Sequence, residues 1–333
     1  MHLPKFEHFC PPSVLEAVEL LKEYGPQSRL VAGGTDLYPR MKYGVTRPEV
    51  VVSLRGLSVK PPTVNQKGDL HLDVLMTLAD VARSPFVRER APLLAETATC
   101  VASNEIRHMG TLGGNLCQEN RCYHFNQTHS FQFVDPCFKR QGDRCYLIPK
   151  GKKCWAVFCS DTAPALIALG ATVEITGPEG ARQLPLESLY TGDALKPLAI
   201  SVNEVLTGVV VPGQGPLRGS AFIKFTLRGG MEFAALNVAV VLDKNEKEGP
   251  CQAARIVAGA LSGGPIRFMK AEEALKGQSI SQDLFRDVAD LVAREAHPAP
   301  HHGFSAVYLK ECLRVQTIRA LSMASKRVGS GSH

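Results

Sequence analysis

The sequence has no apolar run of the roughly 18 residues that a membrane-spanning helix requires. Its first residues, MHLPKFEHFC, lack the basic and then apolar order of a signal peptide. The sequence also lacks a large excess of one charge, because 38 basic and 32 acidic residues give a net charge of only +6. So small and diffuse a surplus gives no support for nucleic-acid binding. These absences predict a cytoplasmic protein without a membrane span or a nucleic-acid partner.

Several nucleotide-binding and catalytic motifs are missing as well. The chain has no G-x-G-x-x-G or G-x-x-x-x-G-K-[ST] pattern, which excludes the Rossmann fingerprint and the P-loop. No H-E-x-x-H, Ser-His-Asp or paired-carboxylate arrangement is visible either. We therefore predict no catalytic side chain on this chain, and hydrolysis has no support.

What the chain does contain is enough apolar sequence for a folded core. Its 333 residues, 44% of them apolar, correspond to about two domains. Residues 13–24 carry apolar side chains at helical spacing and are followed by Gly25 and Pro26, which predicts a helix that ends there. The apolar runs at 30–32 and 50–54 predict buried strands, so the chain opens as α/β.

The same patterns continue along the chain. Residues 70–84 alternate and then become helical from Thr77, and 87–101 predict another helix. Residues 162–175 predict a helix followed by a strand, and 204–212 predict a strand. The mixture of predicted helices and strands therefore continues to residue 212.

The clearest domain boundary is the Pro- and Gly-rich stretch at 212–219. Beyond it, the segments SAFIKFTL, AALNVAVVLD and AARIVAGAL predict three strands of a sheet. Helices are predicted around 267–276, 282–296 and 303–326. The C-terminal third is therefore expected to be α+β.

Two glycine pairs are candidates for binding an anion. Gly33-Gly34 is followed by Thr35-Asp36, and Gly113-Gly114 follows Thr111 and precedes Asn115. Glycine lets a backbone approach a ligand closely, and consecutive N–H groups in a tight turn can bind a pyrophosphate. Ordinary turns have the same composition, so the pattern alone leaves both interpretations open.

The cysteines give a stronger signal. Six of the ten fall between residues 117 and 159, where the chain loses its apolar periodicity from about 118 to 157. We interpret this segment as an inserted loop that four thiolates on a metal centre would order. The candidate ligands are Cys122, Cys137, Cys145 and Cys154. Their spacing lacks the tight C-x2-4-C pair of structural zinc sites, which favours an iron–sulfur cluster while leaving zinc open.

The same loop is basic. Between Glu119 and Phe158 it carries seven Lys or Arg residues and three acidic ones. Such a surplus would compensate an anionic thiolate-bound cluster or bind an acidic electron donor. Cys117 and Cys159 flank the loop and are expected to be small packing residues.

Three segments together carry a resemblance to a known family. LVAGGTDLYPRMKYG, RHMGTLGGNLCQ and SDTAPALIALGATVEI, in this order, resemble the flavin-binding subunit of the molybdenum hydroxylase (xanthine dehydrogenase) family. The resemblance implies an α+β fold in which two α/β subdomains of the vanillyl-alcohol-oxidase/PCMH type bind FAD between them, with a C-terminal α+β domain behind. The implied divisions are 1–57 and 58–216 for the two FAD subdomains, 217–328 for the C-terminal domain and 329–333 for a tail.

The resemblance also implies which residues contact FAD. Those expected at the diphosphate and ribityl portions come from the two glycine segments: Val31, Ala32, Gly33, Gly34, Thr35, Asp36, Leu37, Thr111, Gly114 and Asn115. Gln118 and Asp161 fall where flavin or ribityl contacts are expected, and Leu206 and Lys224 where the family approaches the isoalloxazine.

The insertion resembles one particular branch of that family. A four-cysteine insertion at this point is similar to that of the β subunit of 4-hydroxybenzoyl-CoA reductases, which implies a [4Fe-4S] cluster on Cys122, Cys137, Cys145 and Cys154. This resemblance implies electron transfer from a ferredoxin-like donor through the cluster and FAD to a [2Fe-2S] small subunit and a molybdopterin large subunit, where an aromatic CoA thioester is dehydroxylated. The implied assembly is a hetero-oligomer, and a dimer of heterotrimers is one form that it allows.

Two alternatives remain open on the sequence. The first keeps the family and makes the chain the FAD subunit of an oxidative hydroxylase for a purine, an aldehyde or an N-heterocycle. The second is a non-redox binding scaffold, in which the cysteines bind zinc and the glycine pairs are turns.

Overall fold

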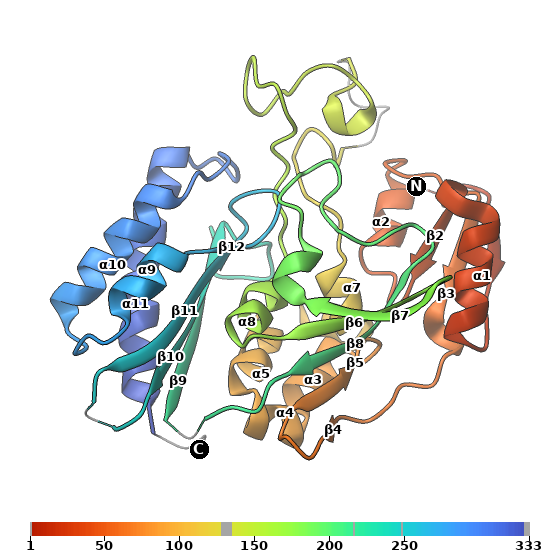
Figure 1. Ribbon diagram of the computed structural model, residues 1–333. Helices are drawn as coiled ribbons and strands as arrows, with labels where there is room; N and C mark the ends of the chain where they lie inside the picture. Colours follow the sequence, from red (N-terminus) through yellow and green to blue (C-terminus); the bar gives the residue numbers. More distant parts are fainter. Residues whose placement is uncertain (1, 128–134, 216, 248, 330–333) are drawn as a thin grey trace.

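Three β-sheets organise the chain in the computed structural model, which describes residues 2–127, 135–215, 217–247 and 249–329 (Figure 1). The sheets stand side by side, and the cysteine-rich insert projects from the top of the view. Of the expected tail, only residue 329 lies within the described residues. None of the helices in the described part of the chain has the length and apolar character needed to cross a bilayer.

The first sheet is parallel and has the strand order β1-β3-β2. Its elements, with the two helices beside it, are β1 (Glu7–Phe9), α1 (Val14–Tyr24), β2 (Ser28–Val31), α2 (Leu37–Lys42) and β3 (Val50–Ser53). The Ser13 side chain accepts a hydrogen bond from the N–H of Glu16 at the start of α1, and Gly25 ends the helix with a φ of 51°. The predicted helix at 13–24 and the predicted strands at 30–32 and 50–54 are confirmed within one or two residues.

The second sheet has five antiparallel strands in the order β4-β5-β8-β6-β7. Its strands are β4 (Thr63–Val64), β5 (Leu70–Asp73), β6 (Thr172–Gly177), β7 (Gly180–Pro185) and β8 (Val205–Val211). The helices beside it are α3 (Leu78–Arg83), α4 (Pro85–Arg90), α5 (Pro92–Thr99), α6 (Asn104–Met109), α7 (Leu112–Leu116) and α8 (Thr162–Ala168).

The prediction of a single helix over 87–101 is wrong. Two helices, α4 and α5, occupy this stretch and meet at Ala91, which has the non-helical angles φ −141° and ψ 59°. Pro92 has no N–H to donate and disfavours a helical conformation of the residue before it, so the first helix stops there.

The third sheet, β12-β11-β10-β9, is covered on both faces. Its elements are β9 (Arg218–Phe225), β10 (Leu236–Lys244), β11 (Cys251–Gly259), β12 (Ile266–Arg267), α9 (Met269–Leu275), α10 (Gln282–Glu295) and α11 (Ala306–Arg327). Val238 and Val240 of β10 belong to the core that includes residues of α9, α10 and α11, whereas Ala239 and Val241 belong to the core that includes α5 and α8. Because side chains alternate along a strand, this arrangement accounts for the nearly continuous apolar sequence of β10.

One polar cluster interrupts the apolar contact between α8 and the third sheet. Lys224 of β9 donates to the Asp161 carboxylate at 2.7 Å and to the Cys100 carbonyl at 2.8 Å, and Asn237 of β10 donates to Asp161 at 2.9 Å. The Asp161 and Lys224 side chains are only 5% and 10% exposed. Burial raises the pKa of the Asp161 carboxyl, although Lys224 and Asn237 act in the opposite direction. The pair therefore joins the start of α8 to the third sheet, and each of the two charges needs the other in order to be buried.

We predict that Lys224→Met destabilises the chain by about 3–5 kcal/mol at neutral pH, because Asp161 would remain buried without its partner. A buried carboxyl whose pKa is raised on folding favours the folded state below its unfolded pKa, and that contribution is lost as the pH rises through the folded pKa. The deficit should therefore be small near about pH 4 and grow toward neutrality. Urea unfolding at both pH values measures it.

The control is the double variant Lys224→Met/Asp161→Asn, which has no ionisable group at this position. It should lose most of the pH dependence. An equal deficit for Lys224→Met at both pH values would contradict the assignment.

Candidate functional site

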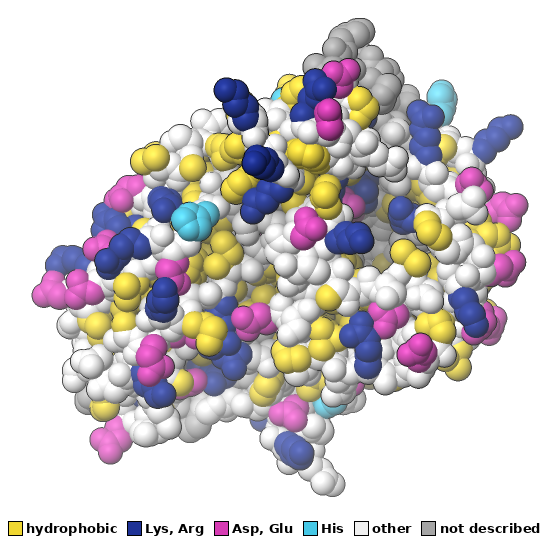
Figure 2. Space-filling model, turned by 45° about the horizontal axis from the view of Figure 1, so that its top comes forward, with side chains coloured by type: hydrophobic (Ala, Val, Ile, Leu, Met, Phe, Trp, Pro, Cys, Tyr) yellow, Lys and Arg dark blue, Asp and Glu magenta, His cyan; other side chains and the backbone are white. Residues whose placement is uncertain are grey.

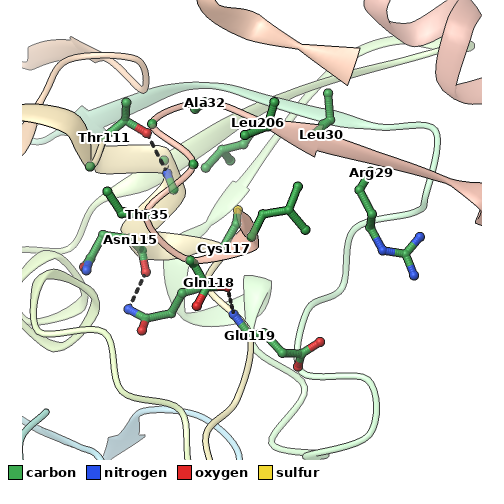
Figure 3. A pocket seen from close by; sticks show the side chains of 18 of the residues that line it. Arg29, Leu30, Ala32, Thr35, Thr111, Asn115, Cys117, Gln118, Glu119 and Leu206 are labelled. Atoms are coloured by element: carbon green, nitrogen blue, oxygen red, sulfur yellow. Dashed lines mark hydrogen bonds between the residues drawn. The ribbon is translucent and has the colours of Figure 1, made fainter. Parts of the chain in front are cut away.

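A cavity of about 920 Å³ lies between the first and second sheets. Its size is at the upper end of the roughly 300–1,000 Å³ that ligand pockets occupy. Its walls come from the segment between β2 and α2, the segment around α7, and the loop that leads into β8. In Figure 3, Thr35, Asn115, Cys117 and Gln118 gather on one side of this space, and Arg29 lies apart from them.

The first glycine segment is shaped by a close backbone contact. A Cβ on Gly33 would lie 1.7 Å from the carbonyl oxygen of Met109, so only glycine fits there. Gly34 has a φ of +74°, which L side chains rarely adopt. The two glycines therefore allow the chain to leave β2, pass against the segment before Thr111 and enter α2.

The second glycine segment is held by the cap of α7. Thr111 Oγ1 accepts a hydrogen bond of 3.0 Å from the N–H of Gly114, and the N–H of Gly113 donates to the Val74 carbonyl at 2.8 Å. The only neighbour that a Cβ on Gly114 would meet within 4 Å is Thr111 Oγ1, at 2.9 Å. Gly114 lines the cavity, so the space beside it belongs to the cavity.

Asn115 fixes this wall to the rest of the fold. Its Oδ1 accepts hydrogen bonds from Ser160 Oγ at 2.7 Å and Thr162 Oγ1 at 2.6 Å, at the start of α8. Gln118 donates from Nε2 to the Asn115 carbonyl at 3.0 Å (Figure 3). The Asn115 side chain is thus positioned by hydroxyl groups at and just before the start of α8, and Gln118 is positioned by Asn115.

Most of the predicted cofactor residues line this one cavity. They are Val31, Ala32, Gly33, Gly34, Thr35, Asp36, Leu37, Thr111, Gly114, Asn115, Gln118 and Leu206. Asp161 and Lys224 are not among the lining residues, because they point toward each other in the buried pair described above. The structure carries no cofactor contact for any of these residues, so their roles stay predictions.

Apart from Asp36, the charged residues of the cavity wall are not among the predicted cofactor residues. Arg29, Arg40, Glu119 and Arg121 all line the cavity, together with most of residues 196–205. The available signal was that Glu119 and Arg121 directly follow the second glycine segment and Arg40 follows Asp36 by one helical turn.

Cys117 also lines the cavity but is not a thiolate. Burial raises the pKa of the Cys117 thiol to about 12, and burial likewise raises that of Cys159 to about 12. Both side chains are therefore protonated at neutral pH, which agrees with the expected packing role. Cys117 packs against the core of the second sheet and Cys159 lies in a small core with Val157 and Ala299.

The insert begins immediately beside the cavity. Arg121 and Val157 pair through two backbone hydrogen bonds of 2.7 and 2.9 Å and close the base of the loop. The buried Asn120 side chain donates to the carbonyls of Ala156 and Gly263, each at 3.2 Å. The two ends of the insert are thereby joined to each other and to the C-terminal part of the chain.

The four candidate ligand cysteines lie near one another inside this loop. Burial raises the pKa of the Cys122 thiol, and the sulfurs of Cys137 and Cys145 raise it further. Burial also raises the pKa of the Cys154 thiol, with smaller effects from Cys122 and Cys137. Backbone N–H groups next to Cys122 and Cys154 act in the opposite direction because they stabilise a negative sulfur.

These thiols are nevertheless not arranged as a formed metal site. Within the described ranges, no group of three or more His, Cys, Asp or Glu side chains is positioned to hold a metal ion. The donor chemistry suits a soft metal or an iron–sulfur cluster. The [4Fe-4S] cluster therefore remains a prediction.

Comparison with known proteins agrees with this architecture. Residues 4–214 match the family of the FAD binding domain in molybdopterin dehydrogenase, and residues 221–324 match the CO dehydrogenase flavoprotein C-terminal domain. The carbon monoxide dehydrogenase medium chain of Afipia carboxidovorans is 27% identical over 97% of this chain and 97% of its own length. The nicotinate dehydrogenase FAD-subunit of Eubacterium barkeri is 24% identical over 93% of this chain and 92% of its own length.

A solved structure supports the same conclusion. A carbon monoxide dehydrogenase chain from Hydrogenophaga pseudoflava superposes with a TM-score of 0.83 at 26% identity, covering 98% of this chain and 100% of that one. The predicted fold class, an FAD-binding α+β region followed by a C-terminal domain, is confirmed. The chain therefore belongs to the family of FAD-binding subunits of molybdenum-dependent dehydrogenases, and it is part of an oxidoreductase.

Proposed function

We propose that this chain is the FAD-carrying electron-transfer subunit of an oxidative molybdenum hydroxylase that acts on an N-heterocycle, an aldehyde or a purine. The observation that carries the proposal is the single cavity into which both glycine segments bring their backbones. The relatives favour oxidation, because those compared above are a nicotinate and a carbon monoxide dehydrogenase. They give no support for the reductive reaction predicted from the insertion.

FAD fits the cavity by its size and by its lining. The glycine segments would hold the diphosphate, since a backbone without Cβ atoms can approach phosphate oxygens and donate N–H groups to them. Asn115 and Gln118 offer amide groups, and Leu206 offers apolar surface. Asp161 and Lys224 would affect the cofactor indirectly, because they fix the segment in which Ser160 and Thr162 hold Asn115 of the cavity wall.

The role of the chain's own side chains is to bind, orient and shield. FAD supplies the redox chemistry when bound, because it can exchange electrons singly or in pairs. The protein contributes a mainly apolar cavity with charged residues in part of its wall, and no side chain of the chain is proposed to react. This division agrees with the absence of any catalytic motif in the sequence.

The substrate chemistry would belong to companion subunits. We propose a molybdopterin-binding large subunit and a [2Fe-2S] small subunit, in a hetero-oligomer that allows a dimer of heterotrimers. The relatives' names, medium chain and FAD-subunit, agree with such an assembly. The proposed divisions of this chain remain 1–57, 58–216 with the insertion at about 118–157, and 217–328.

A second candidate function rests on the insertion. Four half-buried cysteines in a basic loop favour a [4Fe-4S] cluster that would serve as a separate entry or exit port for electrons. Lys150, Lys152 and Lys153 are exposed there, and Figure 2 shows Lys and Arg side chains standing out from the surface around the insert. An acidic, ferredoxin-like protein would fit this surface. With such a donor, the reaction would be the reductive dehydroxylation of an aromatic CoA thioester such as 4-hydroxybenzoyl-CoA.

We predict that Gly114→Val lowers the affinity for FAD by about tenfold or more. The new Cβ would lie 2.9 Å from the Thr111 hydroxyl, so that side chain must shift slightly, and the branched side chain would reduce the space of the cavity that Gly114 lines. Flavin absorbance per chain and a fluorescence titration with FAD measure the effect. Gly215→Val is the matched control, since a Cβ there meets nothing within 4 Å. Full flavin content in Gly114→Val would refute the proposed place of the diphosphate.

A second prediction concerns the insert. Chain produced anaerobically should contain iron and acid-labile sulfide, and Cys137→Ser should lose most of both while keeping FAD, because Cys137 does not line the cavity. Cys10→Ser is the control, since Cys10 is exposed and lies far from the insert in the sequence. Elemental analysis that finds zinc without sulfide, or no metal, would exclude the cluster.

A third prediction separates the two reactions in the assembled enzyme. With its companion subunits present and oxygen excluded, an N-heterocycle, an aldehyde or a purine should bleach the flavin absorbance. If none does, and 4-hydroxybenzoyl-CoA instead restores the absorbance of the dithionite-reduced complex, the reductive function is correct and the oxidative proposal is wrong.

A further inference from the structure

Five charged side chains form a continuous series of ion pairs from the insert to the cavity. Lys139 lies 2.8 Å from Glu119, Glu119 lies 3.4 Å from Arg40, Arg40 lies 3.5 Å from Asp36, and Asp36 also pairs with Arg121. We call this series the bridging network. Four of its members line the cavity, and Lys139 belongs to the insert.

The bridging network is well shielded from water. The exposed fractions of its side chains run from 6% for Lys139 to 25% for Glu119. Exposed single ion pairs contribute little, but several charges held together away from solvent interact more strongly. The pKa of the Glu119 carboxyl is lowered: burial raises it, but Lys139 and Arg40 together outweigh that effect. The network is therefore a candidate for transmitting a change from one end to the other.

Its members come from separate parts of the chain. Asp36 and Arg40 follow the first glycine segment, and Glu119 and Arg121 follow the second. The Arg121 backbone also closes the base of the insert, and its guanidinium lies over the Phe233 ring at 4.6 Å, on the cavity wall. A movement of the cavity wall at Asp36 thus reaches the insert through two routes, the Arg121 main chain and the Glu119–Lys139 pair.

The charge of the network is suited to an anionic ligand. Three cations and two carboxylates leave a net charge of +1. Arg29 adds another positive charge to the wall, and its pKa is lowered by burial and by the neighbouring Arg40. The buried Nε atoms of Arg40 and Arg121 have no hydrogen-bond partner among the described residues. The diphosphate of a dinucleotide would neutralise the surplus positive charge and accept hydrogen bonds from these N–H groups.

We propose that the bridging network couples the cavity to the insert, so that a dinucleotide in the cavity and an ordered insert stabilise each other. The identity of that dinucleotide as FAD rests on the proposed function, whereas the coupling rests on the ion pairs themselves. Thermodynamic linkage makes the effect reciprocal: FAD orders the insert by the same factor by which an ordered insert tightens FAD binding. Lys139 acts in this scheme as a positioning residue, because it touches the insert and Glu119 but does not line the cavity.

The test measures tryptic cleavage of the full chain after Lys150, Lys152 and Lys153, which are exposed in the insert. Cleavage requires local opening, so its rate reports the stability of the loop. Saturating FAD should slow cleavage of the wild-type chain by about fivefold or more, the lower end of typical coupling between sites. Lys139→Met should lose this protection at FAD concentrations that saturate it, and by the same linkage it should bind FAD more weakly by up to about fivefold. Lys139→Arg, which keeps the charge, should retain it.

A matched control excludes a general effect of losing an ion pair. Arg218 and Asp243 form a pair in the third sheet at 2.5 Å, with exposed fractions of 23% and 25%, close to those of the Arg121–Asp36 pair. Asp243→Asn should leave the protection by FAD unchanged. If Lys139→Met does not fold, Glu119→Gln, which has nearly the same shape, replaces it in the same assay.

Two results would count against the proposal in distinguishable ways. If a fluorescence titration shows that FAD binds but does not slow cleavage of the wild-type insert, or protects Lys139→Met equally well, the coupling is absent and the proposed function stands. If FAD does not bind the wild-type chain, both the proposed function and the coupling to FAD are overturned.

Discussion

The cavity depends on one backbone contact that a side chain would prevent. The Met109 carbonyl occupies the position that a Cβ on Gly33 would need, so two segments from different parts of the chain lie directly against each other. This contact places the turn before α2 beside the turn before α7, and both turns then face the same space. A dinucleotide needs such a site, because its phosphates must be reached by backbone groups while its rings require apolar walls. The glycine contact is therefore the geometric condition for all other contacts in the cavity.

A second level of organisation fixes that contact within the whole molecule. Asn115, on the cavity wall, is held by Ser160 and Thr162 at the start of α8. The residue between these two, Asp161, is held by Lys224 of the third sheet. Polar groups buried in this way destabilise the fold when they are unpaired. Their pairing therefore favours one position of Asn115 and α8 against the third sheet. The C-terminal part of the chain consequently helps to define the cavity although most of it lies elsewhere.

The parts that the sequence predicted correctly are those in which neighbouring residues determine the outcome. The helical periodicity of α1 is a local signal of burial on one face. The continuous apolar run of β10 is a local signal of burial on both faces. The six-residue helices α2 and α6 were missed, since they are too short to show a helical period. Pro92 divides a predicted helix, and this signal was present but overlooked.

In the site, the glycine segments were predictable because glycine marks a conformational requirement that is visible at the residue itself. The arginines of the cavity wall gave a weaker signal: Arg40 and Arg121 lie close to the glycine segments in the sequence, but a charge in a sequence does not reveal which surface its side chain reaches. The expected contact of Asp161 and Lys224 with the flavin came from the family resemblance and stays a prediction. Their ion pair, which buries both charges, is a contact that the sequence did not indicate.

The relation between the insert and the cavity follows from covalent geometry more than from any single interaction. Arg121 lines the cavity and Cys122, the first candidate ligand, is the next residue, so their Cα atoms are about 3.8 Å apart. Any centre that Cys122 holds must therefore lie beside the wall against which a dinucleotide would bind. Cys137 and Cys145 act on the charge of the Cys122 thiol, and Lys139 favours the charged form of Cys154. If both proposed sites are filled, the contribution of this chain to a redox reaction is the short separation between them, and that contribution requires no reactive side chain.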